Sequence, residues 1–367
     1  MGKLKRAIGL MSGTSMDGID VALIETDGRS VLHHGPSFTF PYSETFRDRL
    51  RQSVAEARSL KARDERPGVL KLAEQYLTDL SAEAIGQFLE DIQFKPEQID
   101  VVGFHGHTVY HAPERRLTVQ IGDGARLARL LGIPVVYDMR AADVQAGGEG
   151  APLVPVYHKA LATKLGKLPA AFVNIGGVAN VTYVGVDDEL IAFDTGPGNA
   201  LIDDWMLKYA AVAFDADGEV GLNGVVDEQI VHDALCAHYF VEPPPKSLDR
   251  GAFDGAIVEG LSLTAGAATL AAFTAETIAR AREHFPREPS IWVVSGGGRK
   301  NKAIMTRLAA RVENAVVPIE ALGLNGDSIE AEAWGYMAVR VLEGLPLTFP
   351  GTTGVPGPTP GGLIARP

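Results

Sequence analysis

Three short apolar runs separated by glycine turns open the sequence. They span residues 6–11, 19–25 and 30–40, and the turns SGTSMDG and DGR lie between them. Runs of this length that are rich in Ile, Val and Leu and end at Gly, Asp or Ser are typical of β-strands joined by tight turns. The pattern therefore predicts an antiparallel three-stranded meander at the start of the chain.

Helical spacing of apolar residues follows this meander. Between residues 50 and 90, apolar positions recur every three or four residues with charged residues between them, which predicts a helical hairpin. Strands are predicted at 99–104 and 135–137, with a helix at 123–131 between them. The first part of the chain thus continues as alternating helix and strand.

A similar order of elements begins again near residue 171. Strands around glycine and aspartate turns are predicted at 171–175, 178–184 and 189–193, and a helix follows at 199–209. The later elements are a helix at 262–283, a strand at 291–294, a helix after residue 300, a strand at 315–319 and a helix at 328–342. Because both halves start with a meander and continue with alternating helices and strands, the sequence predicts a duplicated α/β architecture.

Two domains are expected from this duplication and from the length of 367 residues. We expect residues 1–140 to form the first α/β domain and residues 141–342 to form the second. The segment 343–367 is expected to pack back on the first domain. Its Pro-, Gly- and Thr-rich part, from residue 346 onward, is expected to be a surface arm.

The charge balance excludes several classes of protein. The chain has 34 Lys and Arg residues against 46 Asp and Glu residues, and its net charge of −12 is unfavourable for binding a nucleic-acid backbone or an anionic membrane surface. The only cysteine, Cys236, cannot form an intrachain disulfide. The start of the chain lacks the apolar run of a signal peptide, and the apolar stretch at 265–275 is too short to span a membrane. We therefore expect a soluble cytoplasmic protein with no nucleic-acid or membrane partner.

Four glycine-rich polar turns could bind phosphate groups. They are GLMSGTSMDGID at 9–20, NIGGVAN at 174–180, FDTGPGN at 193–199 and VVSGGGRKN at 294–301. Each follows or joins a predicted strand, so backbone N–H groups and hydroxyl groups can converge there on a nucleotide. None of them matches the P-loop or the G-x-G-x-x-G pattern. The alternative is that each glycine only supplies the positive φ of a tight turn.

Three histidines lie close together after a predicted strand, in the sequence FHGHTVYH. His105, His107 and His111 could be metal ligands, because H-x-H at a strand end is suited to metal binding. No further histidine or carboxylate cluster at ligand spacing completes such a site in this stretch. The alternative is that the imidazoles line a polar or sugar pocket with neighbours such as Thr108 and Gln120.

Two carboxylates stand at positions that allow either a catalytic or a structural role. Asp194 ends a predicted strand before a Gly-Pro-Gly turn, where a side chain can point into a cleft, but it could instead cap the helix that follows. Glu330 lies at the start of the last long helix, where Asp327 or Ser328 could be the N-cap and Glu330 its capping-box partner. The residues alone favour a structural role for Glu330.

Motifs along the whole chain occur together, and in the same order, in one known family. They are GLMSGTSMDGID, HGHTVYH, LTVQIGD, GGEGAPLVP, NIGGVANVT, FDTGPGNALIDDW, PPPKS, SGGGRKN and GDSIEAEAWGYMA. Any one of them is weak evidence, but together they are specific. On this set the chain resembles the anhydro-N-acetylmuramic acid kinases. The resemblance implies a duplicated actin-like ATPase fold of the ribonuclease H-like type, with two domains around a nucleotide cleft.

The resemblance also implies a reaction. Members of this family use ATP to hydrolyse the 1,6-anhydro ring of 1,6-anhydro-N-acetylmuramic acid and to phosphorylate O6, which gives N-acetylmuramate 6-phosphate and ADP. An acetal oxygen leaves poorly as an alkoxide, and its capture by phosphorus relieves that charge while Mg²⁺ offsets the charge of the phosphates. Water then attacks C1 from the opposite face, as in an inverting glycosidase, and needs a carboxylate base. Peptidoglycan recycling, amino-sugar catabolism and a homodimer are further implications.

Residue roles follow from the matching motifs. The resemblance implies that Asp194 is the general base that activates water. The nucleotide-binding residues that it implies are Gly13, Thr14, Ser15, Met16, Asp17, Gly18, Ile19, Asp20, Gly176, Gly177, Gly196, Gly198, Asn199, Gly296, Gly297 and Gly298. The sugar-binding residues that it implies are His105, Thr108, Gln120, Asp123, Arg140 and Glu330. Arg140 is the natural partner of the lactyl carboxylate, because a guanidinium binds a carboxylate through two parallel hydrogen bonds. No Mg²⁺ ligand is assigned, since Met11 stands where this superfamily commonly has an aspartate.

Several positions depart from the usual pattern of the family. His107 stands where many members have Gln, Ala141 and Ala142 interrupt a longer arginine run, and Glu149 replaces a more usual Gln. The segment LDRGAF also differs from the usual glycine-arginine-glutamate run. Because these changes reduce the positive charge near the sugar, the alternative is a kinase of an uncharged anhydrosugar that resembles levoglucosan kinase. An ATP-driven conformational switch of the same fold is the non-enzymatic alternative.

Overall fold

The computed structural model describes residues 3–13 and 15–367, and the chain divides into two compact units. The terminal unit contains the chain up to Lys164 together with Ser328–Pro367, and the central unit is Leu165–Asp327. The sequence-based expectation places these limits at residues 140 and 342. The limits differ because α11 (Ile329–Leu342) packs on strands of the terminal unit. Tyr157 and Lys164 of α5 (Pro155–Leu165) also donate hydrogen bonds to Glu332 and Leu32 of that unit.

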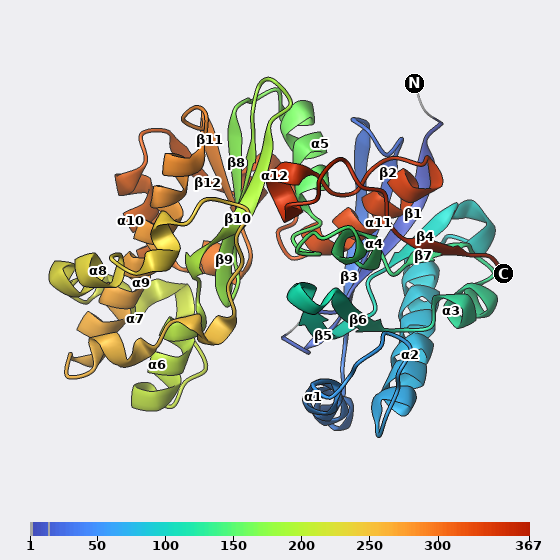
Figure 1. Ribbon diagram of the computed structural model, residues 1–367, viewed down its shortest axis with the longest axis horizontal. Coiled ribbons are helices and arrows are strands. Elements are labelled where there is room, and N and C mark those ends of the chain that lie inside the picture. The colour runs from blue at the N-terminus through green and yellow to red at the C-terminus, as the bar shows by residue number, and fades with distance from the viewer. Residues whose placement is uncertain (1–2, 14) are drawn as a thin grey trace. The chain divides into compact units, whose positions relative to one another are not determined.

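A six-stranded sheet forms the centre of the terminal unit (Figure 1). Its strands are β1 (Lys5–Met11), β2 (Gly18–Thr26), β3 (Leu32–Pro41), β4 (Val101–Phe104), β7 (Val135–Tyr137) and β13 (Leu363–Ala365). They lie in the order β13-β7-β4-β1-β2-β3. Strands β1 to β3 form an antiparallel meander, β4 pairs in parallel with β1 and with β7, and β13 pairs antiparallel with β7. The N-terminal meander predicted from the sequence is therefore confirmed.

Helices and a separate hairpin surround this sheet. The further helices of the terminal unit are α1 (Glu44–Ala57), α2 (Leu70–Asp91), α3 (Gly124–Leu131), α4 (Ala141–Gln145) and α12 (Pro350–Thr353). The hairpin consists of β5 (His107–Ala112) and β6 (Leu117–Ile121), which pair antiparallel. Ser43 is the N-cap of α1, and its hydroxyl accepts a hydrogen bond from the N–H of Phe46.

The two faces of the terminal sheet differ because side chains alternate along a strand. Ile8 of β1 belongs to a core formed with α1 and α2. Gly9 meets the backbone of α11, and a Cβ atom there would lie 1.7 Å from the carbonyl oxygen of Ala331. A Cβ atom on Gly103 of β4 would lie 2.1 Å from the carbonyl oxygen of Trp334. The two glycines therefore allow α11 to lie directly against the sheet.

The central unit is built on a second sheet of the same type. Its strands are β8 (Ala170–Ile175), β9 (Val178–Val184), β10 (Leu190–Pro197), β11 (Ile291–Ser295) and β12 (Ala315–Pro318). They lie in the order β10-β9-β8-β11-β12, with an antiparallel meander β8 to β10 and with β11 parallel to both β8 and β12. All residues of β11 are buried, as expected for an inner parallel strand that is covered on both faces.

One long helix organises the core of the central unit. The helices are α6 (Ala200–Ala210), α7 (Glu219–Leu222), α8 (Glu228–Ala234), α9 (Leu263–Arg280) and α10 (Lys302–Arg311). Helix α9 is buried along most of its length and contacts β9, β10 and the other four helices. Phe273 of α9 and Trp292 of β11 are among the largest fully buried side chains of the protein. The alanine-rich stretch of the sequence is therefore a buried helix, as predicted.

The duplicated α/β architecture predicted from the sequence is confirmed. In the terminal sheet, β1 pairs in parallel with β4, which pairs in parallel with β7. In the central sheet, β8 pairs in the same way with β11, and β11 with β12. Strand β1 and strand β8 thus hold equivalent positions in the two sheets. This is the repeated actin-like, ribonuclease H-like arrangement that the resemblance implies.

Several parts of the chain differ from the sequence-based prediction. The polar stretch after β4 forms the hairpin of β5 and β6, and helices α4, α5, α7 and α8 have no counterpart in the prediction. The expectation of a surface arm after residue 346 is wrong. Leu347, Thr352 and Val355 are buried, and β13 completes one edge of the terminal sheet. Composition indicated an arm because a Pro- and Gly-rich stretch carries no regular pattern that reports its tertiary pairing.

Candidate active site

The first predicted nucleotide turn joins β1 to β2 in the terminal unit. The N–H of Met16 donates to the carbonyl oxygen of Gly13 at 3.1 Å, and Met16 has a φ of 54°. The hydroxyl of Ser15 donates to the carboxylate of Asp17 at 2.7 Å. The turn therefore has hydrogen bonds of its own. Thr14, which the sequence analysis includes in this set, lies outside the described residues.

The rest of that predicted set belongs to strand β2. Gly18 lies against β3, where a Cβ atom would be 2.5 Å from the carbonyl oxygen of Phe40. The side chain of Ile19 is buried in the core, so only its backbone could serve a ligand. Asp20 accepts a hydrogen bond from the hydroxyl of Thr39 at 2.7 Å. Of these three residues, Asp20 is the one with an ionisable side chain.

A cluster of polar side chains forms beyond the end of β4. His105 follows β4, whereas Thr108 and Gln120 are cross-strand partners on β5 and β6. The Nε2 atom of His105 lies 3.4 Å from the hydroxyl oxygen of Thr108 and 3.4 Å from Nη2 of Arg140. The Nε2 amide group of Gln120 donates to Thr108 at 3.2 Å. The structure thus brings together His105, Thr108, Gln120 and Arg140 from the predicted sugar-binding set.

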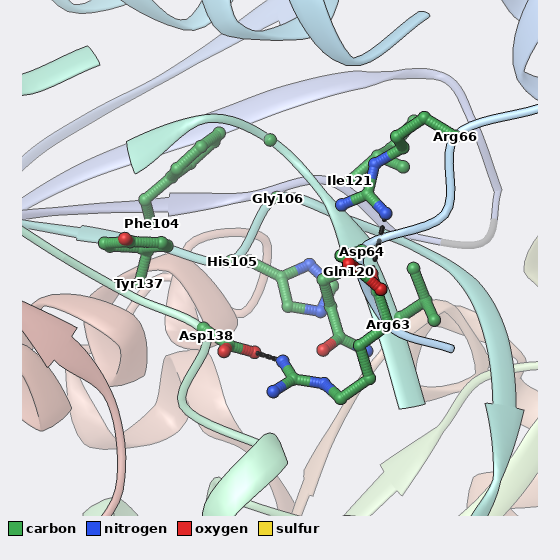
Figure 2. A pocket seen from close by; sticks show the side chains of 12 residues that line it. Arg63, Asp64, Arg66, Phe104, His105, Gly106, Gln120, Ile121, Tyr137 and Asp138 are labelled. Carbon is green, nitrogen blue, oxygen red and sulfur yellow. Dashed lines mark hydrogen bonds and ion pairs between the residues drawn. The ribbon is translucent and has the colours of Figure 1, made fainter. Parts of the chain in front are cut away.

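His105 and Gln120 line a pocket of about 240 Å³ within the terminal unit. Figure 2 shows that Tyr137, Arg63 and Asp138 also line this pocket. Asp138 directly follows β7 and forms an ion pair with Arg63. The Oε1 atom of Gln120 is buried and lacks a hydrogen-bond partner among the described residues. Buried polar atoms are nearly always paired, so this acceptor indicates a place for a ligand hydroxyl or N–H group, or for water.

Arg140, at the start of α4, is held by its neighbours. Its Nη1 donates to the carbonyl oxygen of Gly150 at 2.9 Å, and its Cζ lies 5.6 Å from the centre of the Trp334 ring. Burial lowers the pKa of Arg140 to about 10, although the nearby carboxylate of Glu330 acts in the opposite direction. At neutral pH the guanidinium therefore stays charged. Its buried Nε atom lacks a partner among the described residues and is available as a donor.

The charge state of His105 follows from its surroundings. Burial, and then the charge of Arg140, hold the pKa of His105 well below its usual value. Its Nδ1 lies 3.1 Å from the carbonyl oxygen of Ser12, which can only accept, so Nδ1 carries the proton. The ring also packs on Trp334 with 4.6 Å between ring centres. His105 is therefore a neutral imidazole whose Nε2 accepts a hydrogen bond.

The two other predicted sugar-binding residues have different surroundings. Asp123 is the N-cap of α3, and its carboxylate accepts from the N–H of Arg126 at 2.8 Å. Glu330 is exposed in the first turn of α11. Since Ser328 is the N-cap, Glu330 occupies the second helical position and not the third, so the capping-box alternative for Glu330 is wrong.

Asp194, the predicted base, lies at an irregular point of β10 in the central unit. The pairing of β10 with β9 shifts register between Asp194 and Gly196. The Oδ2 atom of Asp194 accepts a hydrogen bond from the N–H of Leu248 at 2.8 Å, and its own N–H donates to the carbonyl oxygen of Lys246 at 3.0 Å. Burial raises the pKa of Asp194 to about 6, although the Leu248 N–H favours the charged form. Its carboxylate is therefore tied to the segment that contains Leu248 and does not cap α6.

Two glycine turns of the central unit meet at the ends of β8 and β10. The N–H of Asn199 donates to the carbonyl oxygen of Gly176 at 2.7 Å, and the N–H of Gly198 donates to that of Gly177 at 2.9 Å. The side-chain amide of Asn199 donates to the carbonyl oxygen of Ile175 at 3.2 Å. These contacts fix the two predicted turns against each other.

The turn after β11 joins this group. A Cβ atom on Gly297 would lie 3.5 Å from the side chain of Asn199, and one on Gly298 would lie 3.1 Å from it. Gly296 has a φ of 74°, which favours glycine. Gly196 lies apart from this contact, because a Cβ atom there would meet the side chain of Thr277 of α9.

Asn199 and Gly297 line a second pocket, of about 290 Å³, within the central unit. We call it the central pocket, and its other lining residues are Asp203, Phe214, Asp215, Asp217, Lys300 and Asn301. Burial raises the pKa of Asp203 to about 6, and the charge of Asp204 acts in the same direction. The pocket thus combines glycine backbone, an aromatic ring and polar groups.

The histidines do not form a metal centre. The Nδ1 atoms of His105, His107 and His111 contact the Ser12 carbonyl oxygen, the Ser12 hydroxyl and the Thr118 hydroxyl, respectively. Within residues 3–13 and 15–367 we find no group of three or more His, Cys, Asp or Glu side chains arranged to hold a metal ion. The alternative of a polar pocket therefore fits the described residues better than the alternative of a metal site.

Two groups that hold these sites through tertiary contacts were not predicted from the sequence. Trp334 packs on both His105 and Arg140, and the N–H of Leu248 contacts Asp194. Trp334 follows Glu330 by four residues, which places both on one face of α11, so helical spacing was a usable signal for it. A backbone N–H such as that of Leu248 leaves no signal in the sequence.

The repeated sheets and their glycine turns define a protein of the duplicated actin-like α/β class. A family model described as anhydro-N-acetylmuramic acid kinase matches residues 5–366. The anhydro-N-acetylmuramic acid kinase of Bradyrhizobium diazoefficiens is 54% identical over 98% of this chain and 99% of the relative, and that of Rhodopseudomonas palustris is 52% identical over the same shares. The chain belongs to the anhydro-N-acetylmuramic acid kinase family.

Solved structures show weaker similarity. Component A of the (R)-2-hydroxyglutaryl-CoA dehydratase of Acidaminococcus fermentans is 11% identical, with a TM-score of 0.47 over 92% of this chain and 98% of that one. A ROK family glucokinase from Streptomyces griseus, in complex with glucose and AMPPNP, is 13% identical, with a TM-score of 0.43 over 91% of this chain and 99% of that one. Among the helices that the structure describes, none combines the length and apolar character needed to cross a membrane.

Proposed function

We propose that this kinase hydrolyses the 1,6-anhydro ring of 1,6-anhydro-N-acetylmuramic acid and transfers the γ-phosphoryl group of ATP to O6. The products are N-acetylmuramate 6-phosphate and ADP, and the reaction serves peptidoglycan recycling and amino-sugar catabolism in the cytoplasm. Membership of the family over residues 5–366 supports the substrate. The observation that carries the mechanism is the half-buried carboxylate of Asp194, which has a raised pKa at an irregular point of β10.

Asp194 is the general base of the proposed reaction. Oδ2 is oriented by the N–H of Leu248, and the carboxylate removes a proton from the attacking water. The water oxygen bonds to C1 as the C1–O6 bond breaks. O6 bonds to the γ-phosphorus as the bond from that phosphorus to the β,γ-bridging oxygen breaks, and ADP leaves. A base with a pKa near 6 is ionised at neutral pH and still accepts a proton readily.

The sugar is assigned to the terminal unit. Gln120 supports this assignment, because its buried Oε1 is an acceptor without a partner among the described residues, next to the hydroxyl of Thr108. His105 is neutral, and its Nε2 contacts both Thr108 and Arg140, so it orients these two residues of the proposed set. We propose that Arg140 binds the lactyl carboxylate from Nε, the donor that its contacts with Gly150 and His105 leave available. Asp123 and Glu330 complete the proposed set.

The nucleotide is assigned to the glycine turns. We propose that Gly13–Asp20 holds phosphate oxygens through backbone N–H groups, and that the turns at 176–177, 196–199 and 296–298 hold the rest of ATP. The contacts of Asn199 with Gly176 and Ile175 support a common role for the central turns. Mg²⁺ bound to the phosphates would offset their charge during transfer. A homodimer is proposed from the family alone.

The test is ADP release by the purified protein with ATP and Mg²⁺. Three reactions are compared, with 1,6-anhydro-N-acetylmuramic acid, with levoglucosan and without sugar, and each is repeated with Asp194→Asn. We expect ADP release with the muramic sugar only, and its loss by about 10²–10⁴-fold in the variant, as for removal of a general base. Turnover of levoglucosan alone would replace the muramic substrate by an uncharged anhydrosugar. ADP release that ignores both sugars would refute the proposed function.

A further inference from the structure

Ser12, the residue before the first glycine turn, is fixed by three side chains. It is buried at 4% exposure, directly after β1. The hydroxyl of Tyr42 donates to the hydroxyl oxygen of Ser12 at 2.8 Å, and the same oxygen lies 3.0 Å from Nδ1 of His107. The carbonyl oxygen of Ser12 accepts from His105. The hydroxyl and the carbonyl oxygen of Ser12 are therefore both hydrogen-bonded to neighbouring side chains.

Tyr42 also holds the other end of the turn. Its backbone N–H donates to the carbonyl oxygen of Asp17 at 2.9 Å. Its ring packs edge-on against Phe46 of α1, with 4.9 Å between ring centres. One residue thus ties Ser12 and Asp17 to the start of α1, and the bond from the N–H of Met16 closes the turn between them.

His107 supports Ser12 from strand β5. It is 1% exposed, and burial lowers its pKa to about 4, so the hydrogen bond to Ser12 is made by a neutral ring at physiological pH. Its Nε2 atom lacks a partner among the described residues. No contact in the proposed reaction uses His107 or Tyr42, and their polar groups converge on the turn instead.

We propose that Tyr42 and His107 are positioning residues for the nucleotide, which hold Ser12 and Asp17, the two ends of the first glycine turn, in place for phosphate binding. This inference rests on the proposed function, in which that turn contacts ATP. A turn that is ordered before binding loses less conformational entropy when the ligand arrives, so affinity increases without a new contact. Neither side chain touches the nucleotide in this arrangement.

The residue at position 107 provides a sharp test. A Gln side chain is also neutral and can hydrogen-bond the Ser12 hydroxyl, whereas Leu has a similar size and no polar atom. His107→Gln is therefore expected to keep the function of His107, and His107→Leu is expected to lose it. Tyr42→Phe removes the bond to Ser12 but keeps the ring on Phe46 and the N–H bond to Asp17.

The experiment measures the KM for ATP, the KM for the sugar, kcat and the Kd of the non-hydrolysable analogue AMPPNP for each variant. Tyr42→Phe and His107→Leu are expected to raise the KM for ATP and the Kd of AMPPNP roughly tenfold, with the KM for the sugar within about twofold of wild type. His107→Gln is expected to stay within about twofold of wild type in all four values. Tyr110→Phe is the matched control, because the Tyr110 hydroxyl contacts Arg115 and lies outside the turn.

Two patterns would overturn the inference. One is an unchanged Kd of AMPPNP in Tyr42→Phe and His107→Leu. The other is an equal rise in both KM values with a fall in melting temperature, which would mean a purely structural role. If the wild-type protein binds AMPPNP but turns over no sugar, the proposed function fails while the Kd values still decide the inference. If the wild-type protein binds no nucleotide, both fail.

Discussion

The carboxylate of Asp194 is partly withdrawn from water, and this controls when it can act as a base. Burial raises its pKa to about 6, and only the ionised form can accept a proton from water. We expect kcat/KM for the sugar to rise about tenfold for each pH unit at pH values below about 6, and to level off above. The measurement is sugar-dependent ADP release between about pH 4.5 and 8.5. A profile that is flat across pH 6 would mean that another group is the base.

The raised pKa of Asp194 also affects the stability of the folded protein, and measuring this effect tests the pKa shift independently of activity. The folded-state pKa is raised above the unfolded value of 3.8, so the native state holds the proton more tightly. The stability contributed by Asp194 is complete below pH 3.8 and is lost as the pH rises through about 6. The Asn side chain of Asp194→Asn cannot ionise. The melting temperature of this variant minus that of the wild-type protein should therefore increase as the pH rises between these two values. A constant difference between the two proteins would contradict the raised pKa.

At the scale of elements, the contact between α11 and the terminal sheet depends on glycine. In Gly9→Ala the new Cβ atom would lie 1.7 Å from the carbonyl oxygen of Ala331, and neither backbone can move without disturbing the sheet. We expect Gly9→Ala to lower the free energy of unfolding by about 3 kcal/mol. Urea denaturation followed by circular dichroism measures this change.

Gly86 provides the matched control for this substitution. It lies exposed within α2, and a Cβ atom there would meet no atom within 4 Å. Because glycine is a poor helix former, Gly86→Ala should raise the free energy of unfolding by about 0.5–1 kcal/mol. The two substitutions are chemically identical and have opposite expected signs. Equal effects would show that the approach of α11 to β1 is looser than described.

The sequence could predict elements whose residues follow a regular pattern. Strands such as β4 and β11 are apolar runs, and α2 shows helical spacing, so both kinds were predicted. Helix α5 was missed because nearly all of its first eight residues are buried, which removes the alternation of apolar and polar positions. The hairpin of β5 and β6 was missed because polar residues such as Thr108 and Gln120 interrupt its strands.

The candidate site shows the same limit. Glycine turns can be predicted from the sequence, since glycine-rich polar stretches next to strands are uncommon outside turns and binding loops. Tyr42 carries no such mark, because it contacts Ser12 across thirty positions of sequence and belongs to no motif. The support for Asp194 comes from the backbone of Leu248, for which any residue but proline would do. Motifs therefore identify groups that can meet a ligand, and the groups that hold them require the structure.

At the scale of the whole molecule, duplication places comparable turns in both sheets. The turn after β1 and the turn after β8 are each the first connection of a meander, and both belong to the predicted nucleotide set. Backbone N–H groups of tight turns can bind anions, and this is the role that we propose for both turns. The second turn has Gly176 and Gly177 bonded to Gly198 and Asn199, whereas the first is held by Tyr42.

Nucleotide binding should be visible as a change in the stability of the whole protein. Asp194→Asn is the protein of choice, because it is expected to bind ATP without consuming it. A ligand at 100 times its Kd stabilises the native state by about 2.7 kcal/mol. For a unit of this size, we expect ATP with Mg²⁺ to raise the melting temperature by about 5–10 °C, measured by differential scanning fluorimetry.

The substitution Phe214→Ala distinguishes specific binding of ATP from a non-specific stabilising effect of polyanions. Its side chain is 61% exposed and lines the central pocket, so Phe214→Ala should leave the melting temperature without ligand nearly unchanged. If the nucleotide occupies that pocket, the substitution removes an aromatic contact and should reduce the shift produced by ATP. Inorganic triphosphate, which has no base or ribose, should give the same smaller shift with and without Phe214. An ATP shift that Phe214→Ala leaves intact would place the nucleoside elsewhere, and the absence of any shift would contradict the assignment of ATP to the glycine turns.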